Sequence, residues 1–206
     1  MIVEFFGPSC AGKTTLASRL ATHYQEHGIE AARLHARRGR PAYTLRAEFL
    51  RGLVHPKTAF WLIADPRTAA TSQSRTLIRT AGFVHRTRSK QGLHLVDEGP
   101  LRIASALMQK SRRPDLLIGA LPVPDAAVLV HCAPEVRLQR IHAVKRRGRE
   151  ARSDRTILER EERQVRDCLR LAAAIDVPVI EVDTTAGVDH TRSVAGMLDL
   201  LQRGTG

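Results

Sequence analysis

The residues near the start of the chain carry the clearest chemical pattern in the sequence. Positions 7–14 read Gly-Pro-Ser-Cys-Ala-Gly-Lys-Thr, a full match to the phosphate-binding pattern G-x-x-x-x-G-K-[ST]. In such a loop the glycines let backbone N–H groups turn toward phosphate oxygens at the N-terminus of a helix. Lys13 would reach the β- and γ-phosphates, and the Thr14 hydroxyl would bind Mg²⁺. The pattern therefore predicts binding of a nucleoside triphosphate, taken here as ATP, together with Mg²⁺. The predicted nucleotide contacts are Gly7, Pro8, Ser9, Cys10, Ala11, Gly12, Lys13, Thr14 and Thr15.

The segments on either side of this loop are those that the motif requires. The apolar run 2–6 predicts a strand, and the residues from Lys13 to about His27 predict a helix that Gly28 closes. A glycine-rich turn without function is the alternative interpretation. The strand–loop–helix context makes that alternative much the weaker of the two.

Two adjacent acids form a second candidate element of the site. Asp97 and Glu98 follow the apolar run Leu93–Val96, which predicts a buried strand. Acidic side chains at the carboxyl edge of a parallel sheet lie where such folds bind ligands. We expect Asp97 to hold Mg²⁺ through its water shell, and either Asp97 or Glu98 to act as a general base. Ordinary polar residues at the end of a strand are the alternative.

Arginine is concentrated between positions 137 and 155. Several guanidinium groups on a closing segment suit phosphoryl transfer, because charge spreads over the oxygens of the transferred group. This pattern predicts a mobile arginine-rich lid at about 140–155. A solvated basic helix end is the alternative.

Strand-like and helix-like segments alternate along most of the chain, which predicts an α/β fold with a parallel sheet and helices on both of its faces. Residues 36–92 break the alternation, because they hold no good strand and three stretches at helical spacing, so we expect a helical excursion that covers an acceptor. No linker or repeat divides the chain, so a single domain over 1–206 is expected. Strands are expected at 2–6, 29–35, 93–97, 126–132 and 177–183, and further helices at 101–112, from 133 onward and at 189–203.

Composition narrows the partners and the compartment. The formal net charge is +12, which suits a nucleotide, a phosphorylated substrate or nucleic acid, although a solvated basic surface is an equally good interpretation. Aromatic residues make up only 4% and do not interleave with the arginines, so nucleic acid is the less favoured partner and stays open. The three cysteines form no disulfide or zinc pattern. We expect a cytoplasmic protein with no signal peptide and no membrane partner, because the first strand begins at Ile2 and no apolar run is long enough to span a bilayer.

The phosphate loop, the acidic strand end and the stretch 133–141 with its following arginines together resemble the P-loop nucleoside and nucleotide kinases, among which thymidylate kinases and deoxynucleoside kinases are the most similar. The resemblance implies a P-loop NTPase three-layer sandwich with five parallel strands in the order 2-3-1-4-5. It implies transfer of the γ-phosphate of ATP to a small-molecule acceptor, with or without a phosphate of its own. Lys13 and Thr14 would then serve the triphosphate and Mg²⁺, and the loop 183–187 would hold the adenine. By the same resemblance, Arg140, Arg147 and Arg149 would be the lid residues that contact the nucleotide.

The chain departs from those kinases at the acceptor side. Thymidylate kinases have Asp-Arg-Tyr or a near variant at the end of the third strand and deoxynucleoside kinases have Glu-Arg-Ser, whereas this chain has Asp-Glu-Gly-Pro at 97–100. The acceptor therefore stays open, and it is not restricted to nucleosides. A nucleotide-hydrolysing switch and a kinase of nucleic-acid ends are the alternative functions. Kinases of this kind are often dimers, so a homodimer also stays open.

Overall fold

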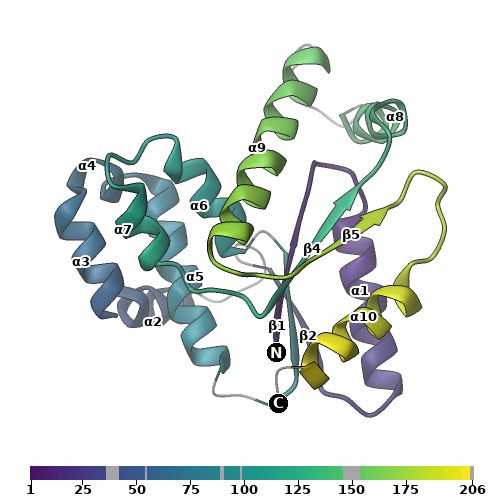
Figure 1. Ribbon diagram of the computed structural model, residues 1–206, viewed down its shortest axis with the longest axis horizontal. Helices are drawn as coiled ribbons and strands as arrows, with labels where there is room; N and C mark the ends of the chain where they lie inside the picture. The colour runs from purple at the N-terminus through teal and green to yellow at the C-terminus, as the bar shows by residue number, and fades with distance from the viewer. Residues whose placement is uncertain (36–41, 54, 89–90, 98, 146–153, 205–206) are drawn as a thin grey trace.

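Five short strands build one parallel sheet at the centre of the computed structural model (Figure 1), which describes residues 1–35, 42–53, 55–88, 91–97, 99–145 and 154–204. The strands are β1 (Ile2–Phe6), β2 (Ala31–His35), β3 (Leu93–Asp97), β4 (Ala126–His131) and β5 (Val179–Asp183). Their order is β2-β3-β1-β4-β5 and every pairing is parallel, which confirms the expected sheet. Because all strands run the same way, their carboxyl ends share one edge, with β1 between β3 and β4.

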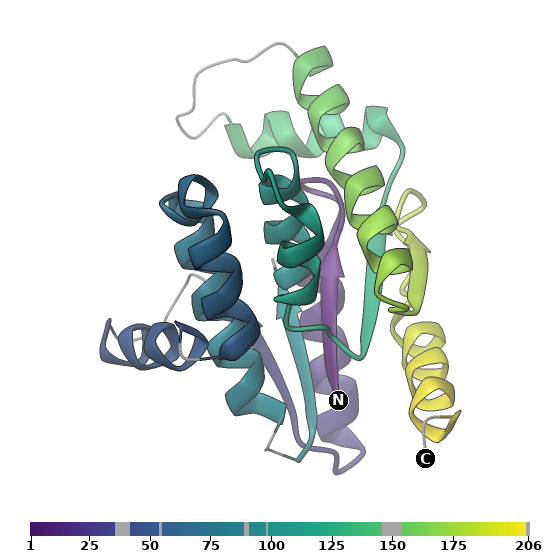
Figure 2. The same cartoon turned by 60° about the vertical axis from the view of Figure 1, so that its left-hand side comes forward.

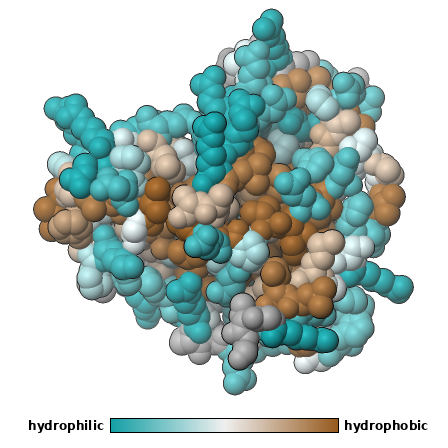
Figure 3. Space-filling model, in the orientation of Figure 1, coloured by the Kyte–Doolittle hydropathy of each residue, from teal (hydrophilic) through white to brown (hydrophobic). Residues whose placement is uncertain are grey.

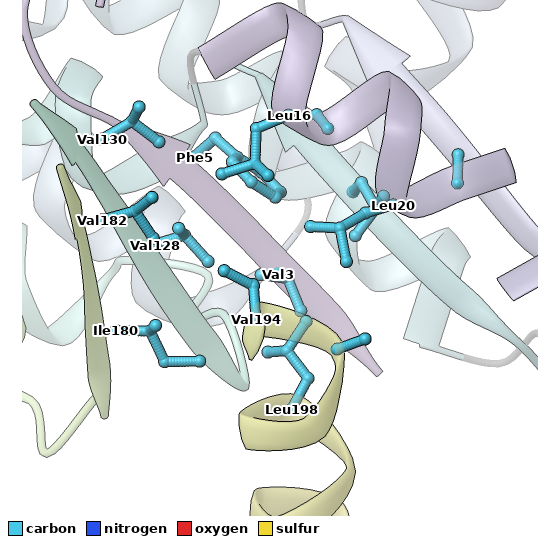
Figure 4. Packing of buried hydrophobic residues seen from close by; sticks show 14 of the residues in the cluster. Val3, Phe5, Leu16, Leu20, Val128, Val130, Ile180, Val182, Val194 and Leu198 are labelled. Atoms are coloured by element: carbon cyan, nitrogen blue, oxygen red, sulfur yellow. The ribbon is translucent and has the colours of Figure 1, made fainter. Parts of the chain in front are cut away.

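Helices α1 (Lys13–Glu26) and α10 (Thr191–Gly204) cover one face of the sheet. Alternate residues of the central strands, such as Val3 and Phe5 of β1, point into this layer and meet Leu20 of α1 and Leu198 of α10 (Figure 4). The side chains of all four residues are fully or almost fully buried. Burial of this kind is the main favourable contribution to folding, and it fixes the position of α1 directly behind the loop at 7–12.

The opposite face carries α5 (Ser72–Arg88), α6 (Pro100–Met108), α7 (Pro114–Gly119) and α9 (Asp154–Ala174). Phe6 of β1 and Leu129 of β4 point to this side and belong to the same core cluster as Leu101 and Leu171. The sheet is thus the middle of three layers, with helices on both faces as expected. Helix α8 (Pro134–Lys145) follows β4 and begins at the proline, which suits a first helical turn.

The helical excursion consists of α2 (Ala42–Leu53), α3 (Pro56–Ala64), α4 (Pro66–Ala69) and the long α5, and the described part of 36–92 contains no strand before β3. Figure 2 shows these helices gathered on one side of the sheet. Helices α2 and α5 approach very closely, because a Cβ atom on Gly52 would lie 1.9 Å from the carbonyl oxygen of Ile78. Trp61 of α3 is fully buried and joins this group to the core.

Several boundaries differ from the sequence-based expectation. The helix expected at 101–112 ends at Met108, since the next segment is held by Asp65, whose carboxylate accepts hydrogen bonds from the Ser111 hydroxyl and the Arg112 N–H. Strand β5 begins at Val179 and not Val177, because proline at 178 has no N–H for the ladder. Helices α7 and α9 were not expected.

None of the helices within the described ranges combines the length and the apolar character needed to cross a membrane.

Candidate functional site

The predicted phosphate loop lies between β1 and α1 and has the backbone conformation that its glycines permit. Gly7 has a φ of +135°, and a Cβ atom there would lie 2.1 Å from the carbonyl oxygen of Val130 in β4. Gly12, directly before α1, has a φ of +98°. An L-residue with a side chain rarely adopts such a φ, and the close approach to β4 leaves no room for one at position 7. Both glycines are therefore required by the path of the loop.

Lys13 begins α1 and its side chain folds back over the loop. Its Nζ donates hydrogen bonds to the carbonyl oxygens of Gly7, at 3.0 Å, and of Pro8, at 2.6 Å. The ammonium group is thus held at the first half of the loop, next to Ser9. A cation in this position can neutralise the charge of an anion bound by the loop N–H groups.

The two residues predicted to bind Mg²⁺ are in direct contact. The Thr14 hydroxyl on α1 donates a 2.7 Å hydrogen bond to Oδ2 of Asp97, which is only 4% exposed at the end of β3. Strand pairing places them together, because Asp97 lies opposite Phe5 of β1, just before the loop. One hydroxyl and one carboxylate are hard oxygen ligands of the kind that Mg²⁺ prefers.

No group of three or more histidines, cysteines or acids in the described part of the chain could hold a metal by itself. Mg²⁺ at Thr14 and Asp97 would therefore need further oxygens from water and from phosphate. Mg²⁺ in nucleotide sites is bound in this way, through one or two protein ligands plus water and substrate phosphates. The residues present thus fit the predicted cofactor.

The loop after β5 packs directly on the phosphate loop. Thr184 donates from its hydroxyl to the carbonyl oxygen of Ala11, at 2.6 Å, and its N–H binds the carbonyl of His131, at 2.9 Å. Arg140 of α8 completes this contact, since its guanidinium donates to the carbonyl oxygen of Thr184, at 3.1 Å, and to that of Cys10, at 3.4 Å. Among the predicted lid arginines, Arg140 lies in the described part of the chain, and the structure brings it to the loop.

A pocket of about 690 Å³ opens between the phosphate loop, α1, α8 and the loop after β5. It is lined by Cys10, Gly12, Lys13, Thr14, Thr15, Leu16, Arg19, Arg140, Thr184, Gly187, Val188, Asp189 and His190. The pocket reaches the segment expected to hold the adenine and extends beyond it to His190. It has the size that small ligands and cofactors occupy.

Hydrogen bonding keeps two carboxylates at this side of the molecule charged. The hydroxyl and N–H of Thr185 lower the pKa of Asp183, and those of Thr191 lower the pKa of Asp189. Asp189 also lies 3.5 Å from the guanidinium of Arg19. The positive charge of the pocket is thus concentrated at Lys13 and Arg140, on the loop side.

A buried carboxylate inside the sheet supports the strand end that carries Asp97. Glu4 of β1 is fully buried and accepts hydrogen bonds from the N–H groups of Leu101, at 2.8 Å, and Arg102, at 3.0 Å, in the first turn of α6. Burial raises the pKa of Glu4 to about 8, against the effect of these two hydrogen bonds. A Cβ on Gly99 would lie 2.6 Å from the Glu4 carboxyl carbon, so the segment between β3 and α6 passes directly over it. Sequence reasoning missed Glu4, although an acid within an apolar strand is a signal.

Several expected contacts lie outside the described residues. These are Glu98, Arg147 and Arg149, together with residues 146–153 of the predicted lid. Of the expected lid at 140–155, residues 140–145 belong to α8 and 154–155 to α9.

Sequence reasoning also missed a contact between α9 and the phosphate loop. The N–H of Ser9 donates to Oε2 of Glu161, at 3.3 Å, and the same oxygen lies 3.6 Å from Nη2 of Arg137. Glu161 lies in a strongly charged stretch that has no motif, so no signal in the sequence indicated it.

Compared with models of known protein families the chain matches none, and no curated protein matches it significantly.

Proposed function

We propose that this protein is an ATP- and Mg²⁺-dependent kinase that transfers the γ-phosphate to a small-molecule acceptor, most simply a nucleoside, a nucleotide or a related metabolite. The hydrogen bond between Thr14 and Asp97 carries the proposal. The loop pattern points to Thr14 and the acid at a strand end points to Asp97, so the two signals are independent, and kinase chemistry requires these residues to meet. A turn that merely joins a strand to a helix gives no reason for that meeting.

The roles of the chain's residues follow from their positions. The loop N–H groups and Lys13 would bind the phosphates, and Arg140 would lie along the nucleotide on the side of the pocket that reaches the loop after β5. Thr14 and Asp97 would hold Mg²⁺, which supplies charge neutralisation at the phosphate oxygens when bound.

The acceptor is expected on the side of β3 that faces the helical excursion. An acceptor oxygen would attack the γ-phosphorus in line, the bond from that phosphorus to the bridging oxygen would break, and ADP would leave. The proton of an acceptor hydroxyl would pass to a carboxylate at the end of β3, for which Asp97 and Glu98 are the candidates. Of these two carboxylates, Asp97 belongs to the described residues and Glu98 lies outside them.

The test is ATP consumption with Mg²⁺ across a panel of nucleosides, nucleoside monophosphates and hydroxylated metabolites. Lys13→Ala serves as the blank, and Lys110→Ala, which removes an exposed ammonium bound to Gln73, is the matched control. One acceptor class should raise turnover far above the rate without acceptor in the wild type and in Lys110→Ala, and not in Lys13→Ala.

Two other outcomes would contradict the kinase proposal. Turnover that is independent of any acceptor would favour a nucleotide-hydrolysing switch. Turnover only with oligonucleotide ends, with binding that survives physiological salt, would favour a nucleic-acid kinase and give the net charge of +12 a function.

A further inference from the structure

The contact between α9 and the phosphate loop places an anion where the loop is expected to bind one. Ser9 is exposed at the tip of the loop, and its N–H donates to Oε2 of Glu161 on α9. A carboxylate oxygen and a phosphate oxygen are both anionic acceptors of such a hydrogen bond. The Lys13 ammonium donates hydrogen bonds to the carbonyl oxygens of Gly7 and Pro8, the two residues before Ser9, so it lies on the same part of the loop.

A buried guanidinium meets the same carboxylate from the other side. The side chain of Arg137 on α8 is only 4% exposed, and its Nη2 lies 3.6 Å from Oε2 of Glu161. Among the described residues, no hydrogen-bond partner is found for Nε or Nη2 of Arg137. Leaving donors of a buried charged group without acceptors is costly, typically about 1–3 kcal/mol for each group.

This geometry is a poor fit to a purely structural ion pair. Strong pairs between arginine and a carboxylate are bidentate, with N···O distances of about 2.7–2.9 Å. Arg137 and Glu161 instead make one long contact through a single oxygen, and that oxygen is shared with Ser9. The Arg137 guanidinium therefore has unused capacity for an anion that brings more oxygens than one carboxylate.

We propose that Arg137 is a ligand of the terminal phosphate of the bound nucleoside triphosphate, and that the Glu161 carboxylate competes with that phosphate for Ser9 and Arg137. The inference rests on the proposed kinase function. A terminal phosphate at Ser9 would lie between Lys13 and Arg137, and its three oxygens match the donors that one carboxylate cannot satisfy. The guanidinium then stabilises the charge on the phosphoryl group during transfer. A nucleoside diphosphate does not reach this position, so Arg137 distinguishes the triphosphate from the diphosphate.

The test compares the affinities of ATP and ADP, each with Mg²⁺, by titration calorimetry on the full chain. Glu161→Gln keeps an oxygen for the Ser9 N–H and removes the competing charge, so ATP should bind about tenfold more tightly while ADP binding is unchanged. Glu162→Gln removes an exposed carboxylate from the next position of α9 and should change neither affinity.

Arg137→Gln should weaken ATP binding by about tenfold or more and leave ADP binding unchanged. Because removal of a buried arginine alone leaves Glu161 without its partner, the double variant Arg137→Gln with Glu161→Gln is measured as well. In the double variant the gain for ATP from Glu161→Gln should disappear.

The results separate this inference from the kinase proposal. If Glu161→Gln changes ATP and ADP affinity by the same factor, or only lowers the melting temperature, the contact is structural and the inference is wrong, while the kinase proposal stands. If the wild type binds neither nucleotide, and Lys13→Ala changes nothing, both are wrong.

Discussion

The phosphate loop and the helical excursion at 42–88 are held in place by different kinds of interaction. The loop and the start of α1 are fixed by hydrogen bonds with residues far away in the chain, such as Asp97, Arg140 and Thr184. The excursion is held by close helix packing at Gly52 and by the buried Trp61, and it exposes the apolar residues Phe60 and Ile63 of α3. Figure 3 shows apolar surface at the left, the side on which Figure 1 places α3. Many different apolar sequences can pack helices together, whereas few residue types fit the backbone geometry and the hydrogen bonds of the phosphate loop. The difference explains why the sequence predicts a nucleotide as one ligand and leaves the acceptor open.

The largest expected effects come from two glycines, one in each region. Gly7→Ala would place a Cβ 2.1 Å from a carbonyl oxygen of β4, and Gly52→Ala would place one 1.9 Å from a carbonyl of α5. Each substitution should introduce strain of about 3 kcal/mol or more. Gly7→Ala should abolish detectable ATP binding in calorimetry. Gly52→Ala should lower the melting temperature and leave the ATP affinity of the folded protein unchanged. The reverse assignment of effects would show that the two regions are not distinct in this way.

The next largest effects are expected at two buried aspartates, Asp97 beside the phosphate loop and Asp65 in the excursion. Asp97→Asn should lower turnover by about 100-fold or more, because the residue at the Thr14 contact loses its charge, with little change in the free energy of unfolding. Asp65→Asn should cost about 1–3 kcal/mol of stability and leave turnover per folded molecule unchanged, because Asp65 lies in the excursion and accepts hydrogen bonds from Thr68 and from Ser111 after α6. Turnover assays and urea unfolding of both variants measure this contrast.

The pH dependence of the Asp65 contribution has a definite sign. Burial opposes its charge, but the hydrogen bonds from Ser111, Thr68 and the Arg112 N–H outweigh burial and lower the pKa of Asp65. Its contribution to stability is therefore present at neutral pH and is lost as the pH falls below the ordinary aspartate value of 3.8. An acid-induced loss of stability that is equally large in Asp65→Asn would contradict this origin.

Glu4 should show the opposite pH dependence to Asp65. Its pKa is raised from 4.5 to about 8, so the folded protein keeps a proton that the unfolded chain releases. The contribution of Glu4 is full below about pH 4.5 and is lost as the pH rises toward 8. Glu4→Gln, compared with the exposed Glu26→Gln, should therefore show a flatter fall in melting temperature between these pH values. If the melting temperature falls with pH equally steeply in the two variants, Glu4 is not the source of this pH dependence.

The smallest expected effect is a difference in reactivity among the three cysteine thiols. Cys10 is partly exposed in the phosphate loop, whereas burial raises the pKa of Cys132 and raises that of Cys168 to about 12. One equivalent of iodoacetamide should react rapidly, at Cys10, and ATP with Mg²⁺ should slow the reaction. Peptide mapping identifies the modified residue. Rapid labelling of Cys132 or Cys168 would mean that the core opens more readily than the loop.

The sequence predicted the elements whose residue types are demanded by local geometry. The glycines at 7 and 12, the strand ending at Asp97 and the helix beginning at Pro134 all belong to this class. Contacts that depend on which helix faces are brought together could not be predicted. Arg137 reads as one more member of a basic run, yet its side chain is almost completely buried against α9.

The boundary errors have the same physical origin. The helix expected to reach Arg112 ends at Met108 because Asp65, 47 residues earlier, binds the N–H of Arg112. Helix α9 was missed because the charges near its start were assigned to a lid, although its later residues Cys168, Leu171 and Ala172 are buried in the core.

The bonds that assemble the phosphate loop span most of the chain, with sequence separations of 83 for Thr14 and Asp97 and 173 for Thr184 and Ala11. Such a site can form only when segments from both halves of the chain have folded together, since no short fragment contains all of it. A nucleotide that binds there would bind the native state and not the unfolded chain, and at 100 times its dissociation constant it would stabilise the fold by about 2.7 kcal/mol. Resistance of the protein to proteolysis, and with it the protein's lifetime in a cell, should then rise and fall with the supply of nucleotide.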